Sequence, residues 1–458
     1  MEKIQSIYIF ILKYTYKITG KIDQRIRNIV IWFASFALIW LCIYNYAVWS
    51  RGADTTQFER DIIGCVLLAI IALFSVDRPL EKILWNRQIV FIWYVFALLL
   101  FISGCLHSVE NSYWLWSISM LIGFPGFYLI WQNRKDYETL FTIIASAMLV
   151  AIVIYFVICL GTISNEVNLY GRYWAFMRNP NHLGKVAVSG MAAILYLFFK
   201  SRYGWLLGIP SGICICLAVL SGSRAAMIII VAQVVAFIIF NLKTYLRTKQ
   251  FRETILTVIF FVVISCAAYS MAERGLEYCQ IHNSETVSEN VDNTVEQSVA
   301  GASIEENNKV LADRFHVEGK TPNQISSGRL DIWKYFLKKI NLLGNDWEKY
   351  KAGTPEYAHQ WAHNDVIEIS YRSGVFAGIF DVLFLMYLGI YILKTLFSKN
   401  IAENSLYFVI FSILAYGGYA MLDVISFPFS MQYTFMFFVS LMPVFERRNE
   451  LCLRCKSQ

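Results

Sequence analysis

Long runs of apolar residues limit the fold of this chain more than any other feature. The runs are about 17 to 24 residues long, the length of helix that crosses the hydrocarbon core of a bilayer. Backbone polar groups in a bilayer must be satisfied within the segment, so the runs predict helices. The runs do not alternate polar and apolar residues as strands of a membrane barrel do. With 57% hydrophobic and 16% charged residues, the sequence predicts an all-α polytopic membrane protein.

Basic residues border the apolar runs in an alternating pattern. Lys and Arg concentrate in every second connection, as the positive-inside rule predicts for cytoplasmic loops. Both termini are therefore expected in the cytoplasm. Because the basic residues border spans instead of forming one patch, the net charge of +7 does not indicate nucleic-acid binding. About twelve spans are predicted, at 28–49, 61–76, 88–106, 113–132, 138–161, 183–199, 204–221, 224–242, 254–272, 374–397, 405–421 and 424–445.

These spans divide the chain into five parts. The basic segment 1–27 is expected to lie on the cytoplasmic surface as an interfacial helix, and spans one to nine fill 28–272. One large extracytoplasmic loop occupies 273–373, followed by spans ten to twelve at 374–445 and a cytoplasmic tail at 446–458. Within the loop, residues 275–308 contain seven acidic residues and no Lys or Arg, a composition typical of disorder.

The second half of the loop contains a predicted amphipathic helix. Ser327 is expected to cap it, Asp331 to lie in its first turn and Gly344 to end it. Arg329 falls near the middle of the apolar arc of this helix. A guanidinium on that side needs a partner charge, which makes Arg329 the strongest anion-binding candidate. The alternative is that it folds back to cap the end of a neighbouring helix.

A polar stretch directly before the tenth predicted span contains two histidines. Read as one helix, it puts His359 and His363 on an apolar face that points toward protein or membrane. His363, with Asn364 beside it, is then a candidate general base, because imidazole titrates in the physiological range. The opposite face, expected to point away from the protein, carries Asp365, Glu368 and Arg372, the last two at ion-pair spacing.

Three motifs place further cations on the expected outer side. Arginines there need a reason, and an anionic ligand is one, although a single arginine can simply anchor at the interface. Arg172 and Arg178 precede span six, and Arg224 opens span eight. The motifs are Arg178-Asn179-Pro180-Asn181-His182-Leu183, Ser221-Gly222-Ser223-Arg224-Ala225-Ala226, and Ser327-Gly328-Arg329-Leu330-Asp331-Ile332-Trp333 followed by His363-Asn364-Asp365.

With these motifs, residues 170–400 resemble the O-antigen ligase and O-antigen polymerase superfamily of bacterial membrane glycosyltransferases. The resemblance implies a GT-C-like helical bundle in the cytoplasmic membrane with an extracytoplasmic active site. It implies an inverting transfer of glycan from undecaprenyl diphosphate to a glycan or lipid-linked acceptor, without a metal or other cofactor. Other polysaccharide assembly proteins are implied as partners, besides membrane lipids. Arg372 departs from the common family pattern, which often has an acidic residue there.

The resemblance also implies roles for individual residues. Arginines that match Arg224 and Arg329 bind the diphosphate, and a histidine that matches His363 activates the acceptor. Guanidinium groups suit this task because negative charge grows on the leaving diphosphate oxygens. A general base typically contributes about 10²–10⁴-fold to the rate. Further candidates for substrate contact are Arg172, Arg178, Asn181, His182 and Asn364.

Two other functional classes share some of these sequence features. A metalloprotease is disfavoured because Gln360 replaces the glutamate of the zincin motif between His359 and His363. A transporter or flippase of lipid-linked oligosaccharide remains the alternative, although transporters commonly show inverted repeats and mid-membrane ionisable residues. Gathering of the special residues on one side favours an enzyme, and the resemblance implies one of cell-envelope polysaccharide biosynthesis. Ligase and polymerase share the visible motifs, and polymerase is slightly favoured.

Overall fold

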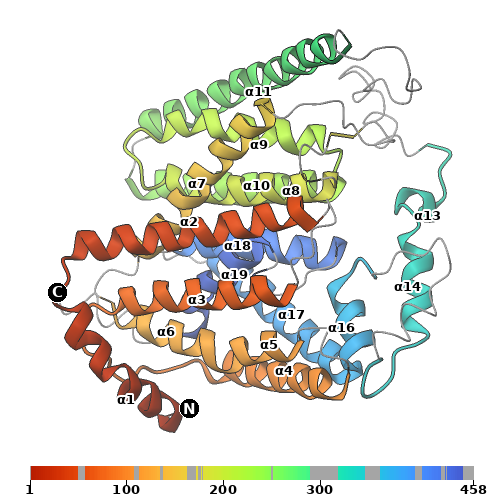
Figure 1. The fold of residues 1–458 in the computed structure, drawn as a ribbon. Coiled ribbons are helices and arrows are strands. Elements are labelled where there is room, and N and C mark those ends of the chain that lie inside the picture. The colour runs from red at the N-terminus through yellow and green to blue at the C-terminus, as the bar shows by residue number, and fades with distance from the viewer. Residues whose placement is uncertain are drawn as a thin grey trace. The chain divides into compact units, whose positions relative to one another are not determined.

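The fold is described by a computed structural model of the chain. Helices make up most of the described part, and the described residues form no strand beyond an isolated bridge between Trp85 and Glu446 (Figure 1). The predicted all-α class is therefore confirmed. The described residues are 2–49, 57–107, 113–134, 138–161, 172–173, 177, 179–248, 251–288, 318–345, 362–397, 405–423, 429 and 431–446.

The chain divides into two compact units, which are described separately. Unit 1 comprises 1–38, 56–143 and 321–458, and unit 2 comprises 39–55 and 144–320. Helices α2 (Gln24–Trp49) and α7 (Glu138–Gly161) cross the boundaries between them. Unit 2 otherwise contains α8 (Pro180–Phe198), η4 (Gly204–Leu207), α9 (Gly208–Leu220), α10 (Arg224–Thr248) and α11 (Phe251–Ser288). Unit 1 contains α1 (Glu2–Thr19), α3 (Gln57–Ser75), α4 (Arg87–Leu106), α5 (Tyr113–Ile118), η2 (Ser119–Gly123), α6 (Phe124–Gln132), α13 (Pro322–Ile325), α14 (Arg329–Leu337), α16 (Asp365–Ser373), α17 (Val375–Phe397), α18 (Ser405–Leu422), α19 (Gln432–Ser440) and α20 (Met442–Phe445).

Within the described residues, seven helices are long and apolar enough to cross a membrane. They cover 24–44, 87–106, 113–132, 138–160, 224–245, 255–279 and 375–397. Shorter apolar helices occupy Gly204–Leu220, Leu406–Leu422 and Gln432–Phe445. The chain is thus a polytopic helical membrane protein, and helices lie at each predicted span. The number twelve stays a prediction.

One boundary differs from the expectation. Helix α11 continues to Ser288, so residues 275–288 are helical and the expected disorder does not begin at 275. The apolar part of α11 packs against α9, and the helix continues from it into the polar residues 275–288. Glycines of α9 allow the close approach, because a Cβ on Gly212 would lie 2.3 Å from the Ser265 carbonyl oxygen.

A π-turn interrupts the span formed by α5 and α6. In π geometry each amide bonds the carbonyl five residues earlier, and Phe124 N–H bonds Ser119 O in this way. Pro125 has no amide hydrogen, so the matching bond to Met120 O cannot form. The Trp93 indole of α4 donates to that carbonyl over 2.8 Å, which ties α4 to this span. The core of unit 1 continues from Trp93 through a cluster of buried aromatic rings: Phe124, Tyr128, Phe384, Phe438 and Phe445.

Candidate functional site

His363 does not lie on a helix. Helix α16 begins only at Asp365, and Asn364 caps it by accepting a hydrogen bond from Ile367 N–H over 3.1 Å. His363 itself has a φ of 52°, in the left-handed region that non-glycine residues rarely adopt. The expected helix through His359 and His363 is therefore wrong at His363, because the Asn364 side chain starts the helix one residue later. His359 lies outside the described residues.

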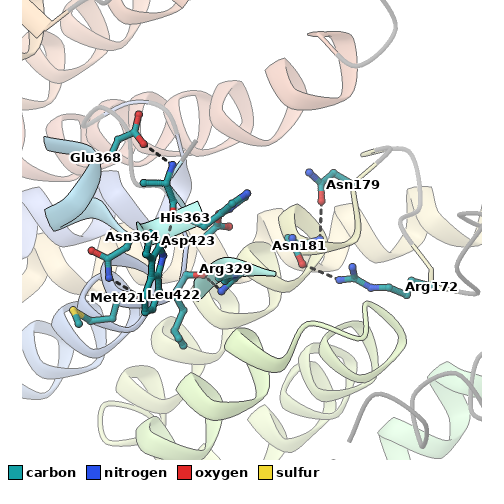
Figure 2. A network of polar contacts seen from close by, with 12 residues as sticks. Arg172, Asn179, Asn181, Arg329, His363, Asn364, Glu368, Met421, Leu422 and Asp423 are labelled. Carbon is teal, nitrogen blue, oxygen red and sulfur yellow. Dashed lines mark hydrogen bonds and ion pairs between the residues drawn. The ribbon is translucent and has the colours of Figure 1, made fainter. Parts of the chain in front are cut away.

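The C-terminal end of α18 holds three of the candidate residues (Figure 2). Asn364 Nδ2 donates to Met421 O over 3.1 Å, and the Arg329 guanidinium donates to Leu422 O. His363 Nδ1 lies 3.0 Å from Asp423 Oδ1. The last carbonyls of a helix have no partner within the helix and carry partial negative charge, so amide and guanidinium donors suit this end. Three consecutive residues of one helix end thus gather His363, Asn364 and Arg329.

The arrangement answers the alternative raised for Arg329. The side chain does cap a neighbouring helix end, because its Nη1 donates to the Leu422 carbonyl. That bond fixes the guanidinium next to the residue that holds His363. Arg329 therefore caps α18 and, through the same hydrogen bond, lies beside His363. Asp423, which completes the arrangement, is not among the residues that the sequence analysis singled out.

Ala362, directly before His363, is fixed through both of its backbone polar groups. Glu368 Oε2 accepts from Ala362 N over 2.7 Å, and Trp333 Nε1 donates to Ala362 O over 2.8 Å. Trp333 lies one turn after Arg329 on α14, and Ala362 is fully buried. A small apolar cluster supports this contact: Ile332, Phe336, Ala362 and Tyr371. The Trp333–Ala362 hydrogen bond thus joins the Gly-Arg-Leu-Asp-Ile-Trp motif to the residue before the histidine motif.

The charged residues of α16 are buried, so the expectation that they point away from the protein is wrong. Asp365, Glu368 and Arg372 are 0%, 1% and 4% exposed. Glu368 and Arg372 form the predicted i, i+4 ion pair. Arg372 also contacts the hydroxyl of Tyr113, the first residue of α5. A helical wheel cannot foresee this burial, because it assumes that charges face water, whereas these charges are compensated inside the protein.

A phenol close to the site is not a competing base. Burial, with smaller effects from Tyr335 and Glu368, raises the pKa of Tyr371. The Tyr371 hydroxyl therefore stays protonated at neutral pH. This leaves His363 as the better base candidate of the two.

The helix that carries Arg329 differs in its ends from the prediction. Gly328, with φ at 80°, occupies the N-cap position that was expected for Ser327, and Ser327 has a positive φ of 58°. The helix ends at Leu337, so Gly344 lies beyond it. Gly344 is still required, because it has φ at 89° and a Cβ there would lie 1.9 Å from Arg372 O.

Unit 2 brings two of the other motifs together. Arg172 Nε donates to Ser221 O over 2.8 Å, and its Nη2 donates to Asn181 Oδ1 over 2.8 Å (Figure 2). Asn179 caps α8, and Gly184 in its first turns lies against Ser223. Arg224 is the first residue of α10 and His182 the third of α8, so both lie at helix N-termini, where anions are favoured. Arg178 lies outside the described residues.

The predicted residues therefore fall into two groups. His363, Asn364 and Arg329 meet in unit 1, and Arg172 and Asn181 meet near the start of α8 in unit 2. That Arg224 acts together with Arg329 stays a prediction. Sequence reasoning missed Asp423, Trp333 and Glu368 as parts of the site. The spacing of Glu368 and Arg372 was noticed, but it gave no sign that the pair is buried.

Comparison with known protein families agrees with the motif analysis. Residues 209–381 match the family described as O-antigen ligase. Among curated proteins, none matches the chain. The matched segment includes Arg224, Arg329 and His363 and confirms the predicted resemblance to the O-antigen ligase and polymerase superfamily.

Proposed function

We propose that this protein, which resembles the O-antigen ligase family over residues 209–381, transfers or polymerises undecaprenyl-diphosphate-linked oligosaccharide. The reaction takes place at the outer face of the cytoplasmic membrane, with both termini in the cytoplasm. The observation that carries the proposal is the fixed placement of His363, on Asp423, beside Arg329 at one helix end. An imidazole and a guanidinium held together suit a reaction that removes a proton and releases a diphosphate.

His363 acts as the general base. With Nδ1–H donating to the Asp423 carboxylate, Nε2 carries the lone pair that takes the proton of the acceptor hydroxyl. The hydroxyl oxygen forms the new bond to the anomeric carbon, while the bond from that carbon to the diphosphate oxygen breaks. The electron pair of the broken bond leaves with the lipid diphosphate, and the anomeric configuration is inverted. The Asp423 carboxylate stabilises the imidazolium that forms.

Arg329 and Arg224 bind the diphosphate. Arginine can offer two parallel donors to a phosphate, and it remains charged at all physiological pH values. The Leu422 carbonyl orients the Arg329 guanidinium, so less conformational entropy is lost when the donor binds. Charge that develops on the leaving oxygens is stabilised without a metal ion. Arg172, Arg178, Asn181, His182 and Asn364 are proposed as further contacts or supports.

The test is a transfer assay with purified protein, lipid-linked glycan and acceptor in detergent. His363→Ala should reduce transfer by about 10²–10⁴-fold while the variant purifies normally. Lys334→Ala, an exposed change on α14, is the matched control and should transfer normally. Normal transfer by His363→Ala would overturn the assignment of the base. A detergent sample has no compartments to transport between. Absence of any transfer by the unmodified protein in this assay would therefore favour the flippase alternative.

Polymerase and ligase differ in their acceptor. We favour a polymerase of a surface polysaccharide, since the motifs do not mark a dedicated lipid or protein acceptor. Surface glycan from a deletion strain distinguishes the two. Single repeat units on the carrier indicate a polymerase, and long chains left on the carrier indicate a ligase.

A further inference from the structure

A short turn after α14 exposes two leucines. Leu342 and Leu343 are 65% and 64% exposed, although they are adjacent large apolar residues in a polar segment. We call residues 341–345 the leucine turn. The neighbouring residue Leu337, at the end of α14, is 53% exposed. Exposed apolar clusters of this kind mark a surface that contacts a partner or a membrane.

The leucine turn is held in place by specific contacts. Asn341 Oδ1 accepts from Leu343 N over 3.0 Å and from Gly344 N over 2.6 Å. Asn345 Nδ2 donates to Tyr371 O over 2.8 Å, and Gly344 packs against Arg372 O. The two leucines therefore project from a built turn that is attached to the last turn of α16.

The turn lies at the level where two apolar helices end. Val375, the first residue of α17, donates its N–H to Asn341 O over 2.9 Å. His107, directly after the last residue of α4, contacts Leu343 O through Nε2 at 3.0 Å. Helix α4 lies beside α16 and α17 (Figure 1). Because α4 and α17 are long and apolar enough to cross the bilayer, we expect their shared end at the boundary between acyl chains and headgroups.

Positive charge accompanies the leucines. Lys338 and Lys339 are exposed, and only Ile340 separates them from the leucine turn. The Lys339 ammonium lies 2.6 Å from the Tyr335 hydroxyl and 4.2 Å from the centre of its ring. Tyrosine and lysine beside exposed leucines are the combination found at membrane interfaces, where lysines contact anionic headgroups.

We propose that the leucine turn is a membrane anchor. Leu342 and Leu343 insert at the acyl boundary of the leaflet where α4 and α17 end, and Lys338 and Lys339 bind anionic phospholipid headgroups. Since the turn is bonded to α16 and follows α14, the anchor holds both helices at the membrane surface. This last consequence rests on the proposed function: it keeps Arg329 at the depth where a lipid-borne diphosphate leaves the bilayer.

A photo-crosslinking experiment tests the anchor directly. The full chain carries p-benzoylphenylalanine in place of Leu343 and is placed in nanodiscs that contain phosphatidylglycerol with alkyne-tagged acyl chains. Lipid adduct should form at position 343 and only at background level at the exposed position Asp331, the matched control on α14 in the same unit. Equal adduct at both positions would overturn the anchor.

Two further arms separate its parts. In anionic nanodiscs, Lys338→Glu and Lys339→Glu should each lower the adduct by about five-fold or more, and in zwitterionic nanodiscs they should have little effect. If the two variants formed as much adduct as the protein with both lysines in anionic nanodiscs too, the headgroup contact would be overturned. The double variant Leu342→Asp/Leu343→Asp should lose glycan transfer in nanodiscs and keep it in detergent. Adduct formation does not depend on activity, so the anchor and the proposed reaction can fail separately.

Discussion

Glu368 is predicted to have two separable roles, one in protein stability through Arg372 and one in activity through the backbone next to His363. Glu368 is 1% exposed, pairs with Arg372 and accepts the Ala362 N–H next to His363. Glu368→Ala leaves a buried guanidinium without its carboxylate, which costs about 3–5 kcal/mol. The orphaned Ala362 amide adds about 1–3 kcal/mol. Since domains are typically stable by about 5–15 kcal/mol, the single variant should show poor yield and a lowered unfolding temperature.

The double variant Glu368→Leu/Arg372→Met separates the two roles. Removing both members of a buried pair is often neutral or stabilising by about 1–4 kcal/mol, so folding should recover. The Ala362 amide still lacks its acceptor, and a shift of about 1 Å at His363 is enough to cost about 10²-fold in rate. We therefore expect an unfolding temperature well above that of Glu368→Ala but below that of the unmodified protein, because the orphaned Ala362 amide still costs about 1–3 kcal/mol, and a strongly reduced kcat.

The assay measures thermal unfolding and glycan transfer on the same detergent-purified samples. Glu368→Gln, which keeps an oxygen for the Ala362 amide, should retain more kcat than the double variant and be less stable. The control is Asp331→Asn/Lys334→Gln, which removes an exposed pair with a 3.8 Å separation and should change stability by less than about 0.5 kcal/mol. A double variant with normal stability and normal transfer would refute a positioning role for Glu368.

Three more predictions concern single residues. Asp423→Asn should lower kcat by about 10²–10⁴-fold with little change in donor KM, since it removes the charge proposed to stabilise the His363 imidazolium; an unchanged kcat in steady-state transfer assays would contradict this. Arg329→Lys should raise donor KM more than acceptor KM, measured by varying each substrate, because the paired donors are lost. Gly344→Ala should destabilise by about 2 kcal/mol or more, because its Cβ would meet Arg372 O. In thermal unfolding, the control Gly319→Ala, which also has positive φ but open space around it, should lose only about 1 kcal/mol.

The apolar runs predicted the helices well, because the requirement to satisfy backbone groups in lipid leaves few alternatives. The site was predicted less completely. Arg329 and His363 were singled out from motifs, and they do meet at one helix end. Asp423 was not assigned a role, because it lies 60 residues from His363 and local periodicity carries no information about such a contact. Its position directly after α18 was the available signal.

Errors arose where a side chain overrides periodicity. The helical wheel at His363 was wrong because Asn364 starts the helix, and the outward direction of Glu368 and Arg372 was wrong because they satisfy each other. Lys185 shows the same limit: it lies within the predicted span 183–199, and it is 3% exposed in α8. Composition averages over a run and hides a single buried charge.

The joint between α16 and α17 consists of Gly374 alone. Only glycine fits here, because φ is 90° and a Cβ would lie 2.1 Å from Leu342 O. The close packing leaves little room for the joint to bend. Ser370 of α16 packs on Gly378 of α17, so we expect the two helices to move together. A helix that tilts to match a thinner or thicker bilayer takes its rigidly attached neighbours along. The proposed glycan transfer should therefore respond to lipid chain length, because a change in the tilt of α17 would also move α16 and His363, the proposed base that precedes it.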